Sequence, residues 1–97
     1  MASEGTYQRA LKKKIRKLLP GAYVLKNDPD WLQGFPDLTI LYNNRWAVLE
    51  VKKSENERFQ PNQEYYVEDL NNLSYSSVIF PENEKEVLHE LQRALGA

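Results

Sequence analysis

The sequence has 97 residues, a formal net charge of −1, one histidine (His89) and no cysteine, and this length has room for one domain, over residues 1–97, with a modest core. The absence of cysteine excludes disulfides, thiolate catalysis and cysteine-based zinc sites, and a single histidine excludes a histidine-rich metal site. Any metal must therefore bind to carboxylate and carbonyl oxygens, a preference typical of hard cations such as Mg²⁺ and Mn²⁺.

The first predicted element is a helix that begins after Ser3, which can cap it, and ends at about Leu19 before Pro20-Gly21. Its apolar residues recur at the spacing of one buried helix face: Tyr7, Leu11, Ile15 and Leu18. Basic side chains cover the rest of the helix, and four of them are candidates for contact with phosphate groups: Lys12, Lys13, Arg16 and Lys17. A merely solvated basic face is an equally good interpretation of these four.

Three strands are predicted next, over residues 22–26, 38–42 and 45–52. The polar segment between the first two contains Asp-Pro-Asp and a glycine, and is predicted to be a loop. The last two strands are separated only by Asn43-Asn44. Because asparagine tolerates positive φ, a two-residue turn at this point indicates a tight hairpin.

The remaining elements are a polar connector over residues 54–60, a helix from Pro61 to about Leu73, a short strand over 76–80 and a last helix over 82–95. The first of these helices has a predicted inner face of Tyr66, Leu70 and Leu73, and the last has Val87, Leu88, Leu91 and Leu95. The order α-β-β-β-α-β-α predicts an α/β fold, a small mixed sheet flanked by helices, in which the third strand, helix and fourth strand form a right-handed parallel crossover.

The hairpin also predicts which side chains face each other. With a two-residue turn, Tyr42 pairs with Arg45, and counting back along both strands places Asp37 opposite Glu50. Opposed residues have Cβ atoms about 4.5–5.5 Å apart, and like charges at this distance are destabilising. Side chains alternate along a strand, so Lys52 shares the face of Glu50.

A divalent cation would compensate the two acids, since Mg²⁺ binds to one or two carboxylates together with waters and a phosphate oxygen. A metal here would polarise a scissile phosphate and activate a water, while Lys52 would orient that water or stabilise developing charge. This chemistry fits phosphodiester hydrolysis. An ordinary cross-strand ion pair on a solvated sheet face is an equally good interpretation of these residue types. Lys53 alternates to the opposite face, so Lys52 is the better candidate for catalysis, and Lys53 is left as a candidate for contact with phosphate groups.

Two further residues extend this candidate site. Glu4 lies one turn before Tyr7 on the buried face of the first helix, so it either points toward the site or simply interacts with the helix N-terminus. Gln63 lies one turn before Tyr66 on the inner face of the second helix, where it either holds a metal-bound water or phosphate, or is an ordinary polar residue at a helix start. Trp31, Phe35 and Trp46 are expected to be packing residues, with base stacking as the less frequent alternative for such aromatic side chains. His89 is expected to be solvated. Asp28 and Asp30 are candidates for extra metal ligands, but the turn chemistry of Asn-Asp-Pro-Asp is the preferred explanation.

Three segments together resemble the PD-(D/E)XK nucleases: Gly34-Phe35-Pro36-Asp37-Leu38, Leu49-Glu50-Val51-Lys52 and Gln60-Pro61-Asn62-Gln63. Within that superfamily the chain is most similar to the virus-type replication-repair nuclease (VRR-NUC) domains, over about residues 3–80. Two departures are a run of Asn71-Asn72 where glycine is common in the family, and an acidic last helix.

The resemblance implies a restriction-endonuclease-like fold and hydrolysis of DNA with Mg²⁺, for which Mn²⁺ would substitute. It implies Asp37 and Glu50 as metal ligands, with the Val51 carbonyl as a third and Glu4 as another candidate. Lys52 would be the catalytic lysine and Gln63 the helix glutamine. Small members of the family are associated with homodimers, branched DNA such as four-way junctions, DNA repair and phage genomes.

The charge is distributed unevenly, because residues 1–60 have 11 basic and 7 acidic side chains whereas residues 61–97 have 2 and 7. The basic front half fits a phosphate-binding face. No segment approaches the roughly 20 apolar residues that span a bilayer, and the N-terminus lacks the apolar core of a signal peptide. A soluble cytoplasmic protein is therefore expected, with DNA as its partner, no membrane contact and no nucleotide cofactor. The alternatives are a non-cleaving DNA-binding or scaffolding module on the same fold, and a structural domain.

Overall fold

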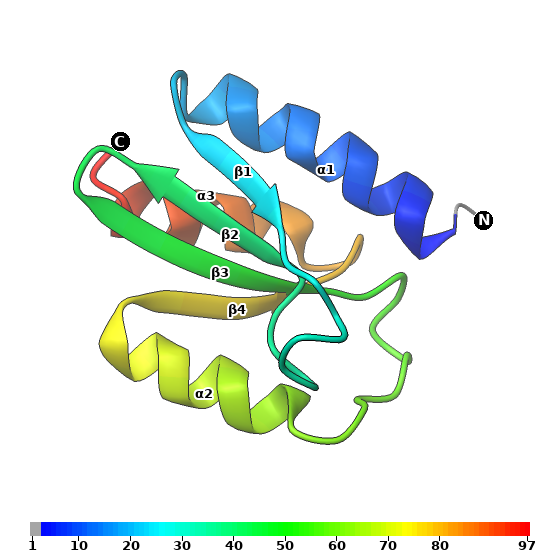
Figure 1. Cartoon of the computed structure of the whole chain (residues 1–97). Helices are drawn as coiled ribbons and strands as arrows, with labels where there is room; N and C mark the ends of the chain where they lie inside the picture. Colours follow the sequence, from blue (N-terminus) through cyan, green and yellow to red (C-terminus); the bar gives the residue numbers. More distant parts are fainter. Residues whose placement is uncertain (1–2) are drawn as a thin grey trace.

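Four strands form one mixed sheet in the order β1-β2-β3-β4 (Figure 1). The computed structural model describes residues 3–97. The β1–β2 and β2–β3 pairs are antiparallel and the β3–β4 pair is parallel. The elements are α1 (Glu4–Leu18), β1 (Tyr23–Lys26), β2 (Leu38–Tyr42), β3 (Arg45–Val51), α2 (Gln63–Leu73), β4 (Tyr75–Ile79) and α3 (Glu84–Ala94). This is the predicted order, and the ends of the elements differ from the prediction by one or two residues.

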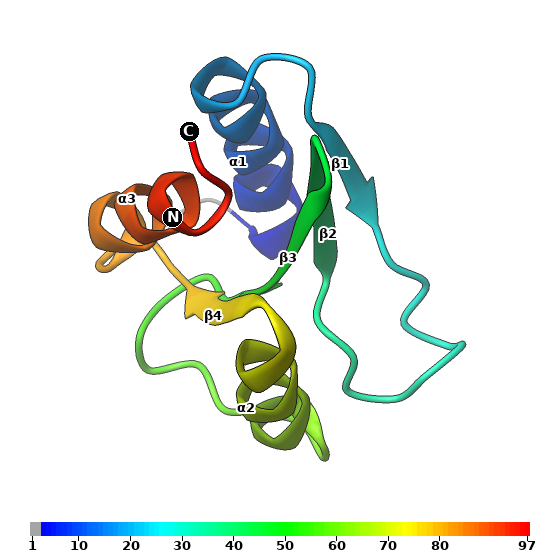
Figure 2. The ribbon, with the colours of Figure 1, turned by 90° about the vertical axis from the view of Figure 1, so that its left-hand side faces the viewer.

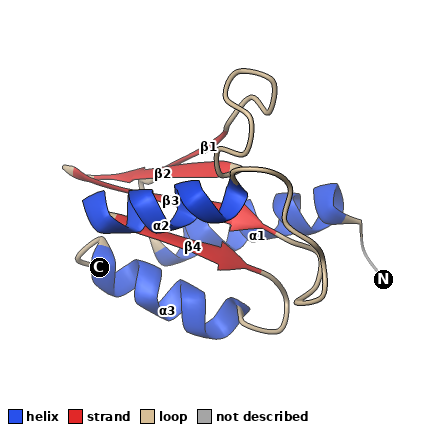
Figure 3. Cartoon of the chain, turned by 90° about the horizontal axis from the view of Figure 1, so that it is seen from below, coloured by secondary structure: helices blue, strands red, loops and turns tan. Residues whose placement is uncertain are grey.

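Helices cover both faces of the sheet. Figure 2 shows α1 and α3 on one side and α2 on the other, and Figure 3 shows the same layers from below. The core lies between the sheet and the α1–α3 layer, and its fully buried residues include Leu11, Ile40, Leu49 and Leu91. In contrast, α2 has no fully buried residue. The face of the sheet beneath α2 is therefore more open to solvent, and the polar ends of β2 and β3 lie on this side.

Helix α1 begins as predicted, because the Ser3 Oγ accepts a hydrogen bond from the Thr6 N–H at 3.1 Å. Its buried face is rotated from the predicted one. Leu11 and Ile15 are fully buried, but the stripe continues through Gln8 and the cap residue Leu19, while the predicted members Tyr7 and Leu18 are only partly buried. Tyr7 stays partly exposed because its hydroxyl group needs a polar partner. This hydroxyl donates to Glu84 Oε1 of α3 at 2.9 Å.

The hairpin has the predicted register. Tyr42 pairs with Arg45 and Leu38 with Leu49, and Asn43 adopts a φ of 56° in the turn. Strand β3 is buried on both faces from Ala47 to Val51, because α1 and α3 cover one face and α2 lies over the other. A glutamate near the end of such a strand is therefore carried into the interior.

The exposure of Leu73 differs from the prediction, whereas that of His89 agrees with it. Leu73 was predicted to lie on the inner face of α2, but it is 70% exposed, because it is the last residue of the helix and points away from the sheet. The prediction for His89 is confirmed, since it is exposed on α3. Within residues 3–97, none of the helices is long and apolar enough to cross a membrane.

Candidate active site

Two carboxyl groups meet where β2 begins and β3 ends. Asp37 directly precedes β2, and its Oδ2 accepts a hydrogen bond from the Val51 N–H at 2.8 Å. Glu50 is only 2% exposed, and its Oε1 has no hydrogen-bond donor among residues 3–97. The two carboxyls are close enough to share a hydrogen bond when one of them holds a proton. The hairpin register thus places two acids side by side, as the sequence predicted.

Both acids are perturbed by this arrangement. Burial, followed by repulsion from Asp37, raises the pKa of Glu50 to about 8. Burial also raises the pKa of Asp37, against the opposing effect of its hydrogen bond from Val51. A buried glutamate with an unpaired oxygen, beside the partly buried Asp37, is unfavourable as a charged pair unless a proton or a cation lies between the two groups. The donor set therefore fits a hard divalent cation.

Lys52 completes the pair from the same face of β3. Its side chain is 4% exposed, and its Nζ lies 3.7 Å from Glu50 Oε2. The Nζ also donates to Gln63 Oε1 at 2.7 Å. An amine held this close to the two acids offsets part of their negative charge, and its position is fixed by hydrogen bonds from two different elements.

Gln63 joins the lysine to the glutamate. Its Oε1 accepts from Lys52 Nζ and from the Gln60 N–H, both at 2.7 Å, and its Nε2 donates to Glu50 Oε2 at 2.9 Å. All the polar atoms of this amide thus have partners. Gln63 lies at the first turn of α2, so it couples the placement of that helix to the geometry of the acid–lysine pair.

The connector between β3 and α2 lies over the same group, and it contributes a residue that the sequence did not indicate. Glu57 Oε2 lies 3.6 Å from Lys52 Nζ, and Glu57 Oε1 accepts from the Lys53 N–H at 2.8 Å. The Arg58 carbonyl accepts from Lys52 Nζ at 3.1 Å, and the Phe59 ring lies 5.3 Å from that nitrogen. Glu57 lies in a segment without any hydrophobic period, so no pattern could have identified it.

Glu4 approaches the site from the first turn of α1. Its carboxyl lies close enough to Glu57 to share a hydrogen bond when one of the two holds a proton. The pKa of Glu4 is raised to about 7 by burial and by the nearby Glu57 and Asp37 carboxylates. Glu4 therefore lies at the edge of the acid group, on the side covered by the connector. Even so, no three His, Cys, Asp or Glu side chains within residues 3–97 are arranged to hold a metal by themselves. A cation at Asp37 and Glu50 would need backbone carbonyl, water or phosphate oxygens as further ligands.

Gly34 permits a close contact beside the site. It has a φ of 85°, and a Cβ at this position would lie 2.5 Å from the Pro61 carbonyl oxygen and 2.8 Å from Asn62 Cβ. Both neighbours immediately precede Gln63. The loop before Asp37 and the start of α2 therefore pack together only because residue 34 has no side chain.

Gly34→Ala is expected to destabilise the protein by about 1–3 kcal/mol, through backbone strain and this clash, and to reduce activity by displacing Gln63. The matched control is Gly21→Ala. Gly21 has a similar φ of 90°, but a Cβ at residue 21 would meet nothing within 4 Å. Urea unfolding of both variants measures the difference, and an equal loss of stability in the two would contradict a role for the Pro61 contact.

The predicted DNA-binding residues are spread over a wider area. Lys13, Arg16 and Lys17 are exposed on α1 and Lys12 is partly buried. Helix α1 runs away from Glu4, so Lys17 lies about 20 Å further along the helix axis. Lys53 is exposed beside the connector. Contact of these residues with DNA stays a prediction, and among them Lys53 lies nearest to the acid pair in sequence.

No family model matches the sequence, and no curated protein sequence matches it. Two solved structures are similar to it in fold. One, described as "VRR_NUC domain", has a TM-score of 0.67 and 24% identity, and the alignment covers 93% of this chain and 94% of that one. Another, described as "VRR_NUC domain protein", has a TM-score of 0.71 and 18% identity, and the alignment covers 99% of this chain and 90% of that one.

The chain has the fold of a VRR_NUC domain. The alignments run over nearly the full length of both partners, so the VRR_NUC fold accounts for all seven helices and strands of this chain. The fold expected from the sequence motifs is therefore confirmed. At these identities the similarity shows the fold, and the chemistry has to be argued from the side chains of this chain.

Proposed function

We propose that this protein is a divalent-metal-dependent DNA endonuclease whose centre comprises Asp37, Glu50 and Lys52. The observation that carries the proposal is the acid pair, in which Glu50 is buried and Asp37 is partly buried. Among residues 3–97 no donor lies at Glu50 Oε1, while Lys52 Nζ lies 3.7 Å from the other oxygen of the same carboxylate. An ordinary cross-strand ion pair would lie on a solvated face and would not leave a buried oxygen unsatisfied. The VRR_NUC fold supports the nuclease class.

Asp37 and Glu50 would hold Mg²⁺ or Mn²⁺, which when bound supplies a Lewis acid for the phosphate and a water of lowered pKa. The Val51 carbonyl is a suitable third ligand. The N–H and C=O of one strand residue point toward the same neighbouring strand, and the Val51 N–H points at Asp37. The carbonyl therefore lies on the Asp37 side of β3.

Lys52 would stabilise the negative charge that develops on the phosphate during hydrolysis, or orient the attacking water. Gln63 is a positioning residue in this account, because it holds Lys52 Nζ with its carbonyl oxygen and Glu50 Oε2 with its amide nitrogen. Glu4 would act at the edge of the site, through Glu57, with which it can share a hydrogen bond when one of the two holds a proton. Lys12, Lys13, Arg16, Lys17 and Lys53 would contact the DNA backbone.

The proposal includes a homodimer that acts on branched DNA such as four-way junctions. Its support is the resemblance of the motifs, together with an apolar edge on the sheet. Tyr23 is 69% exposed and Leu25 is 46% exposed on the edge strand β1, and Leu41 of β2 is 39% exposed beside them. An exposed apolar edge strand favours association with a second chain. Light scattering that shows only monomer would remove the dimer from the proposal.

The test of the proposed function is a cleavage assay with labelled four-way junction, flap and fully paired duplex, each with Mg²⁺, Mn²⁺ or EDTA. We expect cleavage with either metal, none with EDTA, and faster cleavage of the branched substrates. If no substrate is cleaved with either metal, the proposed nuclease activity is wrong. DNA binding without cleavage would instead favour the scaffolding module, although its acids and lysine would then have no evident role.

A further inference from the structure

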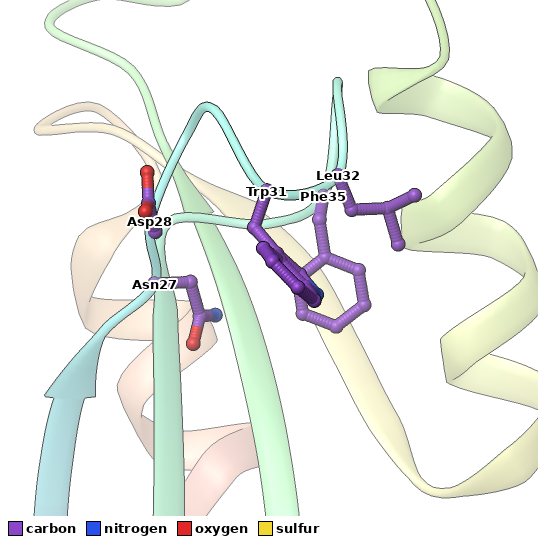
Figure 4. Close-up of a pocket in the computed structure, with 5 residues that line it drawn as sticks. All are labelled: Asn27, Asp28, Trp31, Leu32 and Phe35. Carbon is purple, nitrogen blue, oxygen red and sulfur yellow. The ribbon is translucent and has the colours of Figure 1, made fainter.

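The loop between β1 and β2 holds an exposed tryptophan next to a hollow. Trp31 is 87% exposed, so the expectation that it is a packing residue is wrong. The hollow encloses about 220 Å³ and is lined mainly by apolar atoms of Trp31, Leu32 and Phe35, with Asn27 and Asp28 at its rim. Figure 4 shows the Trp31 and Phe35 rings overlapping in the view, with Asn27 and Asp28 away from them on the other side of the pocket. An aromatic side chain this exposed contributes little to the core.

This hollow is fixed relative to the candidate active site. The Asn27 N–H donates to the Asp37 carbonyl at 2.8 Å, and Asn27 Nδ2 donates to the Pro36 carbonyl at 2.8 Å. On the other side, the Phe35 ring packs edge-to-face on Tyr66 at 5.7 Å between centroids. Tyr66 follows Gln63 by one turn of α2. The hollow therefore adjoins both the metal-binding aspartate and the helix that positions Lys52.

We propose that Trp31 and Phe35 bind an unpaired nucleobase of the DNA substrate by stacking. The inference rests on the proposed function and names a feature of the substrate: unpaired nucleotides beside the cleavage site. Aromatic side chains stack on any base, and a base within a duplex has no free face to offer. The choice of a base over a backbone phosphate follows from charge, because Asp28 at the rim and Asp30 in the same loop repel phosphate.

The carboxylate of Asp28 also suits this ligand. Its Oδ1 accepts from the Asp30 N–H at 2.8 Å. A carboxylate oxygen can also accept a hydrogen bond from an amino group of a base. Lys26, immediately before the loop, acts on Asp37 through its charge. It is also the last residue of β1 and pairs with Leu38, the residue after Asp37.

The test compares Trp31→Ala with the wild-type protein in EDTA, where no cleavage occurs. Binding is measured by fluorescence anisotropy with labelled duplex that has a short single-stranded overhang and with the same duplex fully paired. We expect about 5- to 100-fold weaker binding of the overhang DNA, no change for paired duplex, and recovery of most of the loss in Trp31→Phe. The control is Leu73→Ala, which removes another exposed apolar side chain at the far end of α2.

A second readout reports contact directly. The chain has two tryptophans, so in a Trp46→Phe background the emission comes from Trp31 alone. Single-stranded oligonucleotide is expected to quench it, and paired duplex is not.

Three results would overturn the inference: equal binding of overhang DNA by Trp31→Ala and wild type, equal weakening for both substrates, or a shift of Trp31→Ala from dimer to monomer in light scattering, which would assign the hollow to a second copy of the chain. Failure of the proposed nuclease function can be distinguished from failure of the stacking proposal. A wild-type protein that neither binds nor cleaves any DNA removes both proposals, whereas metal-dependent cleavage with an unchanged substrate preference in Trp31→Ala removes only the stacking.

Discussion

Lys52→Ala is expected to lower the rate of DNA cleavage by at least about 100-fold, the loss typical of removing one group that stabilises charge in a transition state. The Nζ of Lys52 lies among Glu50, Gln63 and Glu57 and is nearly inaccessible. No other amine is positioned there among residues 3–97, so none can replace it. The measurement is the single-turnover rate on the substrate that the wild-type enzyme cleaves fastest, with Mg²⁺ in excess.

Lys53→Ala is the matched control, because it removes the same functional group from the next residue, which is exposed and not part of the buried set. Its single-turnover cleavage rate should stay within about tenfold of wild type, since a single phosphate contact contributes mainly to binding. Loss of Lys52 also leaves Glu50 without its nearest cation, so thermal unfolding of the variant must be measured. Lys52→Met fills nearly the same space without the charge, so it separates a loss of catalysis from a loss of packing. Wild-type cleavage by folded Lys52→Met would show that the lysine is not catalytic.

Glu50→Gln is expected to change activity and stability in opposite directions. Cleavage should be lost, because the replacement removes one of the two proposed metal ligands. The metal-free protein should become more stable at pH 8, because the replacement removes a buried charge that faces Asp37. Thermal unfolding in EDTA measures the second effect. Few substitutions of buried polar residues stabilise a protein, so the combination would be diagnostic of a metal-binding acid pair.

The raised pKa of Glu50 also predicts how the stability of the metal-free protein changes with pH. Burial raises the pKa of Glu50 from 4.5 to about 8. Between these values the folded state holds a proton that the unfolded state has released, so stability falls as pH rises through the window. The loss in metal-free wild type should be of the order of a few kcal/mol and should be smaller in Glu50→Gln. Glu4, with its pKa raised to about 7, contributes in the same direction, so Glu4→Gln is measured alongside.

Metal-free wild-type protein that is as stable at pH 8 as at pH 5 would contradict this account. So would a Glu50→Gln variant that is less stable than wild type at pH 8. Addition of Mg²⁺ at pH 8 is expected to stabilise wild type and to leave Glu50→Gln unchanged, because binding to the folded state alone raises stability.

The hairpin was the most predictable part of the molecule. Two asparagines fix the length of the turn, and alternation along the strands fixes the register, so the juxtaposition of Asp37 and Glu50 follows from local geometry. Lys52 follows from the same alternation. These three residues are separated by at most 15 positions, and their relative placement depends on one turn. Their proximity can therefore be predicted from the sequence.

The rest of the site depends on tertiary packing. Gln63 contacts Lys52 and Glu50 only because Gly34 lets the start of α2 pack against the preceding loop. Glu57 belongs to a connector without periodicity. Trp31 has a large apolar side chain of the kind that usually packs in a core. Its exposure depends on the path of its loop. None of these placements has a local signal, because each depends on contacts between distant segments.

Anomalous diffraction from a crystal soaked in Mn²⁺ tests most directly whether Asp37 and Glu50 hold a divalent cation. We predict a peak that lies between the two carboxylates and within coordination distance of Glu50 Oε1, the oxygen for which the described part of the chain supplies no donor. The peak should be absent in Glu50→Gln crystals treated identically. A Mn²⁺ peak elsewhere, for example at Glu4 and Glu57, with no density between Asp37 and Glu50, would contradict the account.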